Sequence, residues 1–388
     1  MPDGREPLSA RTLASIREIA PETWNALAGA SDPFVAHGFL AALEDSGSAT
    51  ASTGWAPMHL VIEDSSRQAL AAAPLYRKSH SYGEYVFDHA WADALGRAGG
   101  RYYPKLLSAV PFTPATGPRL LVPPGLDPAR ALDLRATLAS ALIQVAERIG
   151  VSSLHVNFPG PDDARVLGQA GYLARLGIQY HWQNRNYASF EDFLGNLASR
   201  KRKAIRKERA GVRASGVVLT VLTGPDVREA HWDAFYAFYR DTTERKWGGG
   251  YLTREFFSLL GERLAERVVL VLALHAGRPV AGALNLLGHD TLYGRHWGCI
   301  ADFRFLHFEA CYYQAIEFAI ARGLSRVEAG AQGEHKIQRG YLPAPTHSFH
   351  WLKDGAFRDL IARHLERERA VVRAELAELA GFSPYRRG

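Results

Sequence analysis

The stretch covering residues 293–351 constrains the fold more than any other part of this sequence. Between residues 308 and 322, apolar and small residues recur at the i, i+4, i+7 and i+8 spacing of one helical face, namely Tyr312, Ile316, Ala319 and Ile320. Gly323 follows at the place where a left-handed helix C-cap is expected. Strand-like runs at 292–297 and 326–330 flank this helix. The stretch therefore predicts a strand, a helix and a second strand in that order.

A charged loop bounded by glycines follows the second of these strands. It carries Glu334, His335, Lys336 and Arg339. Polar groups placed directly after a strand are where α/β folds usually hold their chemistry. We therefore interpret this loop as the candidate active site. Pairing of Glu334 with Arg339 across a turn is the structural alternative.

The length of 388 residues favours two domains of roughly 150–200 residues each. Both halves alternate short apolar runs with helices, which is typical of an α/β (α+β) chain. In the first half we expect strands at 58–62, 70–76 and 153–158, and a helix at 129–149 that ends at Gly150. In the second half we expect strands at 217–222, 268–274, 279–286 and 348–352, a helix at 229–240 and a hairpin turn at 276–278. A long helix at 356–379, with Phe357, Ile361 and Leu365 four residues apart, is expected to pack on the second half.

Composition narrows the class of protein. Apolar residues make up 47% of the chain and charged residues 22%, as in globular proteins. No apolar run approaches the ~18 residues of a membrane span, and the N-terminal residues lack the apolar core of a signal peptide, so we expect a cytoplasmic protein. The two cysteines, Cys299 and Cys311, are interpreted as buried free thiols because two cannot form a disulfide framework.

The net charge of +6 has a local origin. Residues 200–209 read RKRKAIRKER, with seven basic residues and one acid on a segment that permits a helix. Such a run is compatible with a polyanionic partner. A solvated helix between domains explains it equally well, because a basic run alone is a weak signal.

Four long segments carry a resemblance to a known family. They are SYGEYVFDHAWADAL (81–95), YYPKLLSAVPFTPATGPRLL (102–121), ERKWGGGYLTREFF (244–257) and EAGAQGEHKIQRGYLP (328–343). On these segments and the basic run, the chain resembles the FemAB-like group of bacterial N-acyltransferases, tandem relatives of the GNAT fold. The resemblance covers nearly the full length and identifies the family better than the reaction.

The resemblance implies two GNAT-like domains in tandem, at 1–188 and 216–388, joined by a basic helical connector at 189–215. It also implies transfer of an acyl group to an amine. Better-understood relatives build peptidoglycan cross-bridges from aminoacyl-tRNA, whereas ordinary GNAT enzymes use acyl-CoA. Lys336 is similar to the lysine of a phenylalanine-lysine element in relatives, but His335 stands where they have an aromatic residue.

The donor site departs from the GNAT pattern. GNAT enzymes cradle the pyrophosphate of CoA with a glycine-rich turn at a helix N-terminus. The corresponding loop here, Cys299–Ala310, contains no glycine. Backbone amides or Arg304 remain as phosphate ligands. The missing glycines therefore weaken the acyl-CoA interpretation without removing it.

Amine acylation needs a proton acceptor and donors for the oxyanion, but no metal and no covalent nucleophile. The candidate bases are Glu334, His335 and Glu309, with His335 favoured because its ordinary pKa of about 6.5 suits proton transfer near neutrality. The candidate donor-binding residues are Lys336, Arg339, Arg304, Arg200, Arg202 and Arg206. A zinc site at His307 and Glu309 is disfavoured because no third ligand lies at metal spacing.

Carboxylates and aromatic residues gather in one short segment of the first half. Glu84, Tyr85, Asp88 and Trp91 are candidates to recognise an acceptor amine, or they tie a loop to the core. Two further acceptor candidates are Trp247, which precedes a glycine-rich loop that we expect to be mobile, and Tyr341.

Two classes of function remain open. The leading hypothesis is an N-acyltransferase that moves an acyl group from a thioester, acyl-CoA or acyl carrier protein, to an amine of a peptide, amino acid or cell-wall precursor. An aminoacyl-tRNA donor of FemAB type is the alternative. The other class is a non-catalytic protein that binds a peptide or cell-wall precursor on the same scaffold. Oligomeric state cannot be derived from the sequence.

Overall fold

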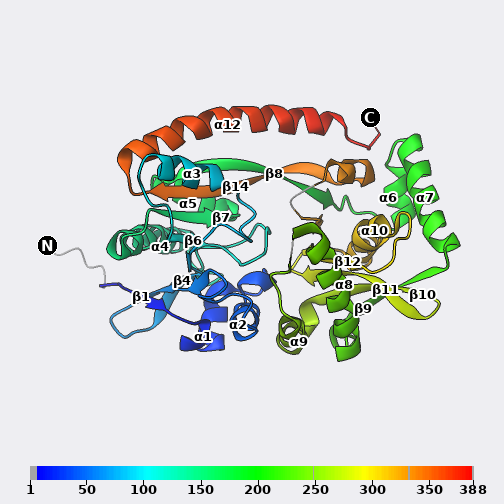
Figure 1. Ribbon diagram of the computed structural model, residues 1–388, viewed down its shortest axis with the longest axis horizontal. Coiled ribbons are helices and arrows are strands. Elements are labelled where there is room, and N and C mark those ends of the chain that lie inside the picture. The colour runs from blue at the N-terminus through cyan, green and yellow to red at the C-terminus, as the bar shows by residue number, and fades with distance from the viewer. Residues whose placement is uncertain (1–6, 248, 331–332, 387–388) are drawn as a thin grey trace. The chain divides into compact units, whose positions relative to one another are not determined.

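The computed structural model describes residues 7–247, 249–330 and 333–386 (Figure 1). The chain forms two compact units. Unit 1 consists of Met1–Gly177 and Thr346–Val372, and unit 2 consists of Ile178–Pro345 and Arg373–Gly388. These bounds differ from the expected ranges because Thr346–Val372, near the C-terminus, belong to unit 1 again. The basic segment belongs to unit 2 as the helix α7 (Ser199–Ala214) and is not a separate connector.

Unit 1 contains two sheets. Its main elements are β1 (Ser9–Leu13), α1 (Pro21–Ala28), α2 (His37–Asp45), β2 (Trp55–Pro57), β3 (His59–Glu63), β4 (Ala69–Ala73), β5 (Tyr76–Lys78), α3 (His89–Arg97), β6 (Lys105–Ser108), α4 (Pro128–Ile149), β7 (Ser153–Asn157) and α5 (Pro161–Gln169). The smaller sheet has the order β1-β3-β4 and is antiparallel. The larger has the order β2-β5-β6-β7-β14, where β14 (Leu342–Leu352) enters from the far end of the chain. Within it, β6 and β7 are parallel.

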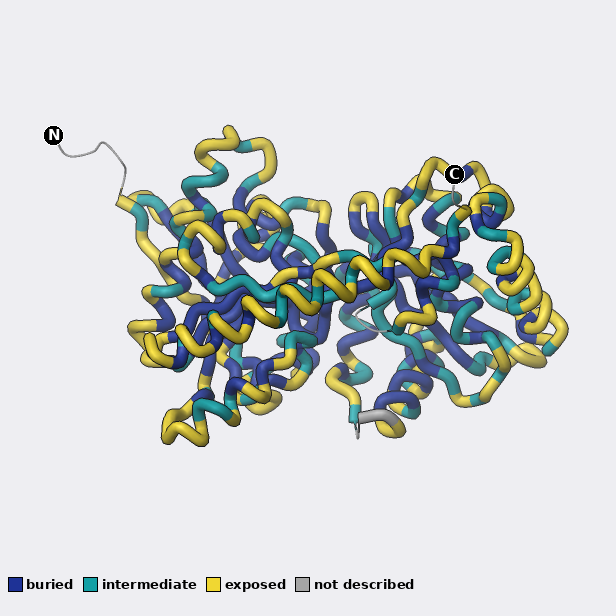
Figure 2. The backbone as a smooth tube through the Cα atoms, turned by 90° about the horizontal axis from the view of Figure 1, so that it is seen from above, coloured by how far each residue is buried: buried dark blue, intermediate teal, exposed yellow. Residues whose placement is uncertain are grey.

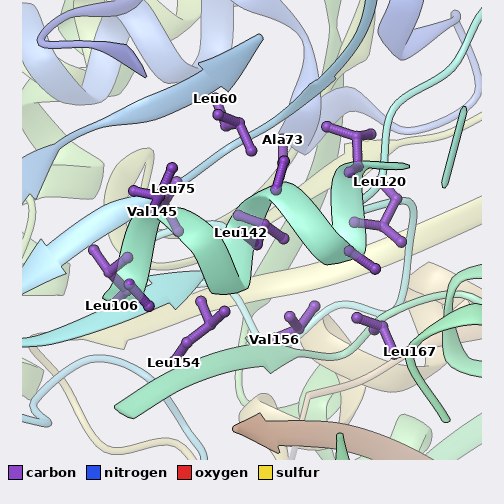
Figure 3. Packing of buried hydrophobic residues seen from close by; sticks show 14 of the residues in the cluster. Leu60, Ala73, Leu75, Leu106, Leu120, Leu142, Val145, Leu154, Val156 and Leu167 are labelled. Carbon is purple, nitrogen blue, oxygen red and sulfur yellow. The ribbon is translucent and has the colours of Figure 1, made fainter. Parts of the chain in front are cut away.

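The core of unit 1 lies between helix α4 and the larger sheet. Asp127 caps the start of α4 by accepting from the amides of Ala129 and Arg130, and Gly150 ends it with φ +73°, as its sequence predicted. Leu138 and Leu142 of this helix are fully buried in one apolar cluster with residues of β6 and β7 (Figure 3). Because side chains alternate along a strand, Lys105 of β6 and His155 of β7 lie on the opposite face, together with Leu107.

Unit 2 is built on one mixed sheet. Its main elements are β8 (Leu173–Gln183, from its sixth residue), α6 (Phe190–Gly195), α7, β9 (Val217–Thr223), α8 (Glu229–Trp247), α9 (Arg254–Arg263), β10 (Val268–His275), β11 (Arg278–Leu287), β12 (Thr291–Cys299), α10 (Leu306–Phe308), α11 (Gln314–Ala321) and β13 (Arg326–Glu328). The strand order is β8-β13-β12-β11-β10-β9. The predicted hairpin between β10 and β11 is confirmed, and it turns through Ala276 and Gly277, both with positive φ.

Aromatic side chains dominate the core of unit 2. Trp182, Phe193 and Tyr313 are buried there with Ile316 and Val327. Tyr312 and Ala319 are also buried, so the helical stripe predicted from the sequence faces the core, with Ile320 at its margin. The buried face of α11 thus holds the helix on the strands that lead into the predicted site loop.

The C-terminal helix α12 (Gly355–Gly381) is confirmed as a helix, and exposed positions recur along it (Figure 2). Its stripe packs differently from our expectation. Phe357, Ile361 and Leu365 bury themselves against Trp91 and Tyr102 of unit 1, because β14 has just returned the chain to that unit. The cysteines also differ, since both are free but only half-buried. No helix in the described residues is long and apolar enough to cross a membrane.

Candidate functional site

The candidate site of unit 2 begins where two parallel strands stop pairing. Strand β12 pairs with β13 only over Thr291–Tyr293, opposite Arg326–Glu328, and β12 then continues alone on that side to Cys299. A bulge in the pairing of β12 with β11 lies next to this point, between Leu284 and Asn285 of β11. Bulges beside active sites commonly redirect side chains. The second half of β12 therefore presents half-buried residues that no neighbouring β13 residue covers.

A π-helical turn, Glu309–Tyr313, joins α10 to α11. Such turns occur mostly as single insertions in α-helices, frequently at functional sites. The helix starts after Phe305, whose φ of +71° is unusual for a non-glycine residue. The amides of Leu306 and Phe308 donate to the carbonyls of Phe303 and Phe305. Two amides at this helix start are therefore already bonded within the protein. The loop also lacks the glycines of a phosphate-binding turn.

His335 lies at the centre of the site loop, in a 3₁₀ helix (Glu334–Arg339). Its Nε2 is 3.0 Å from the hydroxyl of Tyr312, which the π turn supplies. Burial lowers the pKa of His335, and the positive charges of Arg339 and Lys336 lower it further. The imidazole is therefore neutral at pH 7 and able to accept a proton.

His335 belongs to a cluster of aromatic rings that we call the aromatic wall. Its members are Trp297, His307, Phe308, Tyr312 and His335, and their ring centroids lie 5.3 to 6.2 Å from those of neighbouring members. Trp297, His307 and Phe308 are half-buried, while Tyr312 is buried. The wall offers a flat, mostly apolar surface next to a hydrogen-bonded base.

The two basic residues of the loop are engaged within the protein. The ammonium of Lys336 donates to the carbonyls of Ala329 (2.6 Å) and Gly330 (3.1 Å), and burial lowers its pKa to about 8. The guanidinium of Arg339 stacks 3.4 Å from the Phe308 ring and donates to Glu208 (2.8 Å) and to the carbonyl of His335 (2.8 Å). In this structure both residues fix the loop in place.

Helix α7 supplies consecutive residues that hold the site. Glu208 pairs with Arg339 and accepts from the hydroxyl of Tyr313. Arg209 pairs with Glu309 (2.9 Å) and Glu317 (2.6 Å). Glu309 is buried and also accepts from Gln314, so its carboxylate is committed to structure. One face of the basic helix thus carries a structural role that the sequence did not indicate.

The other predicted residues of unit 2 lie outside this constellation or at its margin. Glu334 and Arg304 are exposed, and Arg304 stacks on Phe305. On α7, Arg200 is exposed, Arg202 donates to the carbonyl of Leu197, and Arg206 pairs with Glu191. Tyr341 is fully buried and donates to the carbonyl of Tyr312. The side chain of Trp247 and the residues Gly248, Ala331 and Gln332 lie outside the described residues.

The predicted acceptor residues of unit 1 form a different arrangement. Glu84 and Asp88 are buried and both accept from the ammonium of Lys105, at 2.8 and 2.5 Å. Trp91 is buried against His350, with ring centroids 4.8 Å apart. Tyr85 is half-buried with φ +58°. The structure therefore brings the two carboxylates together around a lysine of the protein itself.

Sequence reasoning missed several residues. Helical spacing predicts only that Tyr312 lies on a buried helix face. It does not reveal the π turn that carries Tyr312, or the contact of its hydroxyl with His335. The pair His181 and Glu328, on facing positions of β8 and β13, places a buried carboxylate beside the site loop. No short-range pattern signals it, because the two residues are far apart in sequence. Within the described residues, no group of three or more His, Cys, Asp or Glu side chains is arranged to hold a metal ion.

Known proteins resemble this chain over most of its length. The pattern of the FemAB-like family, described as peptidoglycan biosynthesis/recognition, matches residues 15–387. The fold is similar to that of the C-terminal DUF2156 domain of a putative lysylphosphatidylglycerol synthetase from Agrobacterium fabrum, with a TM-score of 0.54 and 10% identity over 92% of this chain and 98% of that one. It is also similar to FemX, with a TM-score of 0.52 and 12% identity over 91% of this chain and 100% of that one. A third similar structure is L-PGS from Bacillus licheniformis, with a TM-score of 0.51 and 11% identity over 87% of this chain and 98% of that one.

These likenesses concern the fold alone, because the identities are low. With the mixed sheets of both units, they confirm the predicted α/β fold class. No protein of curated function matches the sequence.

Proposed function

Because the chain belongs to the FemAB-like family and is a transferase, we propose that it is an N-acyltransferase whose chemistry takes place in unit 2. The pairing of His335 with Tyr312 beside a half-buried aromatic wall is the observation that supports this most strongly. The proposed donor is a thioester, acyl-CoA or an acyl carrier protein. The proposed acceptor is an amine of a peptide, amino acid or cell-wall precursor, in keeping with the description of the family.

His335 is the proposed base. In the tautomer that carries its hydrogen on Nε2, the imidazole donates to the hydroxyl of Tyr312 and keeps a lone pair on Nδ1. The amine nitrogen attacks the thioester carbonyl carbon and loses one proton to Nδ1. The tetrahedral intermediate then collapses, the carbon–sulfur bond breaks, and the thiolate takes up a proton to leave as a thiol. An amide is formed, and His335 returns to its neutral form when it releases its proton.

Arg339 is a positioning residue in this scheme. Its bond to the carbonyl of His335 fixes the loop, and its charge helps to keep the pKa of His335 below the ordinary value. Glu309 and Glu334 fit the role of base less well. The first is committed to Arg209 and Gln314, and the second is exposed.

The aromatic wall supports a thioester donor, because apolar and aromatic surface suits the chain of a pantetheine or acyl group. One observation favours aminoacyl-tRNA instead. Arg200, Lys203 and Lys207 of α7 are all exposed and lie on one side of the helix, as a polyanion would require. We therefore keep tRNA as the second candidate. Recognition of the acceptor by Glu84, Tyr85, Asp88 and Trp91 stays a prediction, and the two carboxylates would first have to leave Lys105.

The experiment has two steps. Native mass spectrometry of the full chain with acetyl-CoA, a long-chain acyl-CoA, an acyl carrier protein and an aminoacyl-tRNA identifies the donor. The pH dependence of kcat/KM is then measured with that donor. Because the base must be neutral, we expect activity to fall on the acid side with an apparent pKa below 6.5.

Arg339→Gln removes the positive charge that depresses the pKa of His335, so the acid limb should move to higher pH. Arg278→Gln, a change of an exposed arginine at the start of β11, is the matched control and should leave the limb in place. A limb that does not move in Arg339→Gln, in a variant with unchanged thermal unfolding, would contradict the assignment of His335.

A further inference from the structure

The polar face of the larger sheet in unit 1 carries a row of basic side chains. Lys78 on β5 lies directly opposite Lys105 on β6, and His155 on β7 lies directly opposite His350 on β14. The two histidines share a hydrogen bond of 2.7 Å between their Nδ1 atoms. We call these four residues the basic row. It crosses four adjacent strands on one face.

All four members of the basic row are buried, and each lysine side chain is 0% exposed. Like charges opposite each other on neighbouring strands destabilise a sheet, and a buried charge is costly unless it is paired. Lys78 packs 3.7 Å over the ring of Trp55, and burial lowers its pKa to about 7. Such a row needs a nearby anion to persist in the folded protein.

The anion is supplied by the connection between β5 and β6, residues 79–104. Antiparallel neighbouring strands need only about 2–5 residues to connect them, so this segment is much longer than the topology requires. It covers the basic row, and we call it the cover. All three partners of the Lys105 ammonium come from it, namely Ser81 (2.7 Å), Glu84 (2.8 Å) and Asp88 (2.5 Å).

The cover has the reverse of the usual polarity of a surface segment. Two of its three acids, Glu84 and Asp88, are buried, while Tyr82 and Phe87 are 61% and 62% exposed. Aromatic side chains normally supply the apolar contacts that hold a loop down. The cover is held both by the ion pairs of Glu84 and Asp88 and by an apolar cluster that includes its Trp91 and Tyr102.

The match between the cover and the sheet is incomplete. Three buried atoms at this contact have no hydrogen-bond partner in the described part of the chain: Glu84 Oε1, Asp88 Oδ1 and Asn157 Oδ1. A buried polar group that is left unpaired destabilises the folded state. Burial also raises the pKa of Glu84 to about 7, although two lysines face it. A segment that served only to neutralise the lysines would be expected to saturate its own carboxylates.

We propose that the basic row is a binding site for an anionic group, a carboxylate or a phosphate, and that Glu84 and Asp88 of the cover occupy it as internal counter-ions until such a group displaces them. The chemistry of the row fits this ligand, because lysines bind carboxylate and phosphate as point charges. The site lies wholly in unit 1. Its existence does not depend on which reaction unit 2 performs.

Hydrogen–deuterium exchange of the full chain tests the displacement. Exchange is measured with inorganic phosphate, with succinate, and with sodium chloride at equal ionic strength. We expect either phosphate or succinate to speed exchange at residues 79–104 relative to chloride, and the effective anion identifies the class of ligand. Exchange that is the same in all three salts would overturn the proposal, because the cover would then be a fixed structural element.

A variant gives an independent measure. Glu84→Gln with Asp88→Asn keeps the shape of both side chains but removes the competing charges, so the effective anion should bind about tenfold more tightly, as measured by calorimetry. Asp93→Asn, an exposed acid of the same segment, is the matched control. If the double variant does not fold, Glu84→Gln alone carries the test. A folded variant that binds the anion no better than the parent would contradict the proposal.

Discussion

Each unit contains a pair of parallel strands followed by a loop, and the two loops differ in what they leave accessible. In unit 1, β6 and β7 lead to a region filled by Arg119, which is 1% exposed and donates to the carbonyls of Asn157 (3.0 Å) and Ala115 (2.6 Å). In unit 2, β12 and β13 lead to an exposed histidine and a half-buried aromatic wall.

The two units therefore differ in how their polar side chains are engaged. Unit 1 turns its polar residues inward and ties them to one another under a cover. In unit 2, helix α7 pairs with charged residues of the site loop, and the imidazole of His335 stays exposed. Fold alone therefore does not place the chemistry, and the engagement of each polar side chain is the better guide.

The largest expected effect is a loss of stability when Lys105 of unit 1 is replaced. Lys105→Met leaves Glu84 and Asp88 buried without their partner, so we expect a loss of about 3–5 kcal/mol in the free energy of unfolding. Urea denaturation measures it. Lys353→Met, the same change at an exposed position of unit 1, is the control and should stay within about 0.5 kcal/mol of the parent. Equal stability of the two variants would show that the buried ion pairs do not hold unit 1.

A smaller loss in the free energy of unfolding is expected when the pH is lowered, and both units contribute to it. Burial lowers the pKa of His155 in unit 1 and of His181 in unit 2 to about 3. The unfolded chain takes up protons on these residues below about pH 6.5, whereas the folded chain resists until about pH 3. Stability is therefore fully present above pH 6.5 and is lost as the pH falls toward 3, by up to about 1.4 kcal/mol per pH unit for each histidine.

Urea denaturation between pH 7.5 and 5 measures this loss. His155→Gln should reduce the slope of stability against pH, because it removes one of the residues that titrate on unfolding. A slope that is the same in the variant and the parent would contradict the buried, neutral state of His155.

The smallest expected effect concerns the exposed side of α7. Neutralising Arg200, Lys203 and Lys207 should leave binding of acyl-CoA nearly unchanged, as measured by calorimetry, if the donor is a thioester. For tRNA, each lost phosphate contact would lower the slope of log K against log salt by about 0.7–0.9. Arg206→Gln is the control, because Glu191 already neutralises that residue. A large change in slope with tRNA alone would favour the second candidate for the donor.

Much of the fold could be predicted from the sequence. Local periodicity places β7, α4, β10 and β11 within a few residues of their observed bounds, because these elements bury one face in a regular pattern. The return of β14 to unit 1 could not be predicted. Its partner β7 lies almost 200 residues earlier, and the pattern of a strand does not reveal which strand it pairs with.

The site was predictable only in part. Charges between glycines marked the loop of His335, and its role stays a prediction. The sequence could not show that Lys336, Arg339 and Glu309 are engaged, because their partners come from distant or non-periodic positions such as the carbonyl of Ala329 and the helix α7. The counter-ions of Glu84 and Asp88 were hidden for the same reason.

A paired measurement tests the central claim most directly, namely that proton transfer belongs to unit 2. Single-turnover acyl transfer at saturating donor and acceptor is compared for His335→Gln and His155→Gln. The account predicts a loss of at least ~100-fold in the first variant with unchanged thermal unfolding, the scale of a removed proton-transfer group. It predicts a rate near that of the parent in the second. A normal rate in His335→Gln, or a comparable loss in a folded His155→Gln, would contradict it.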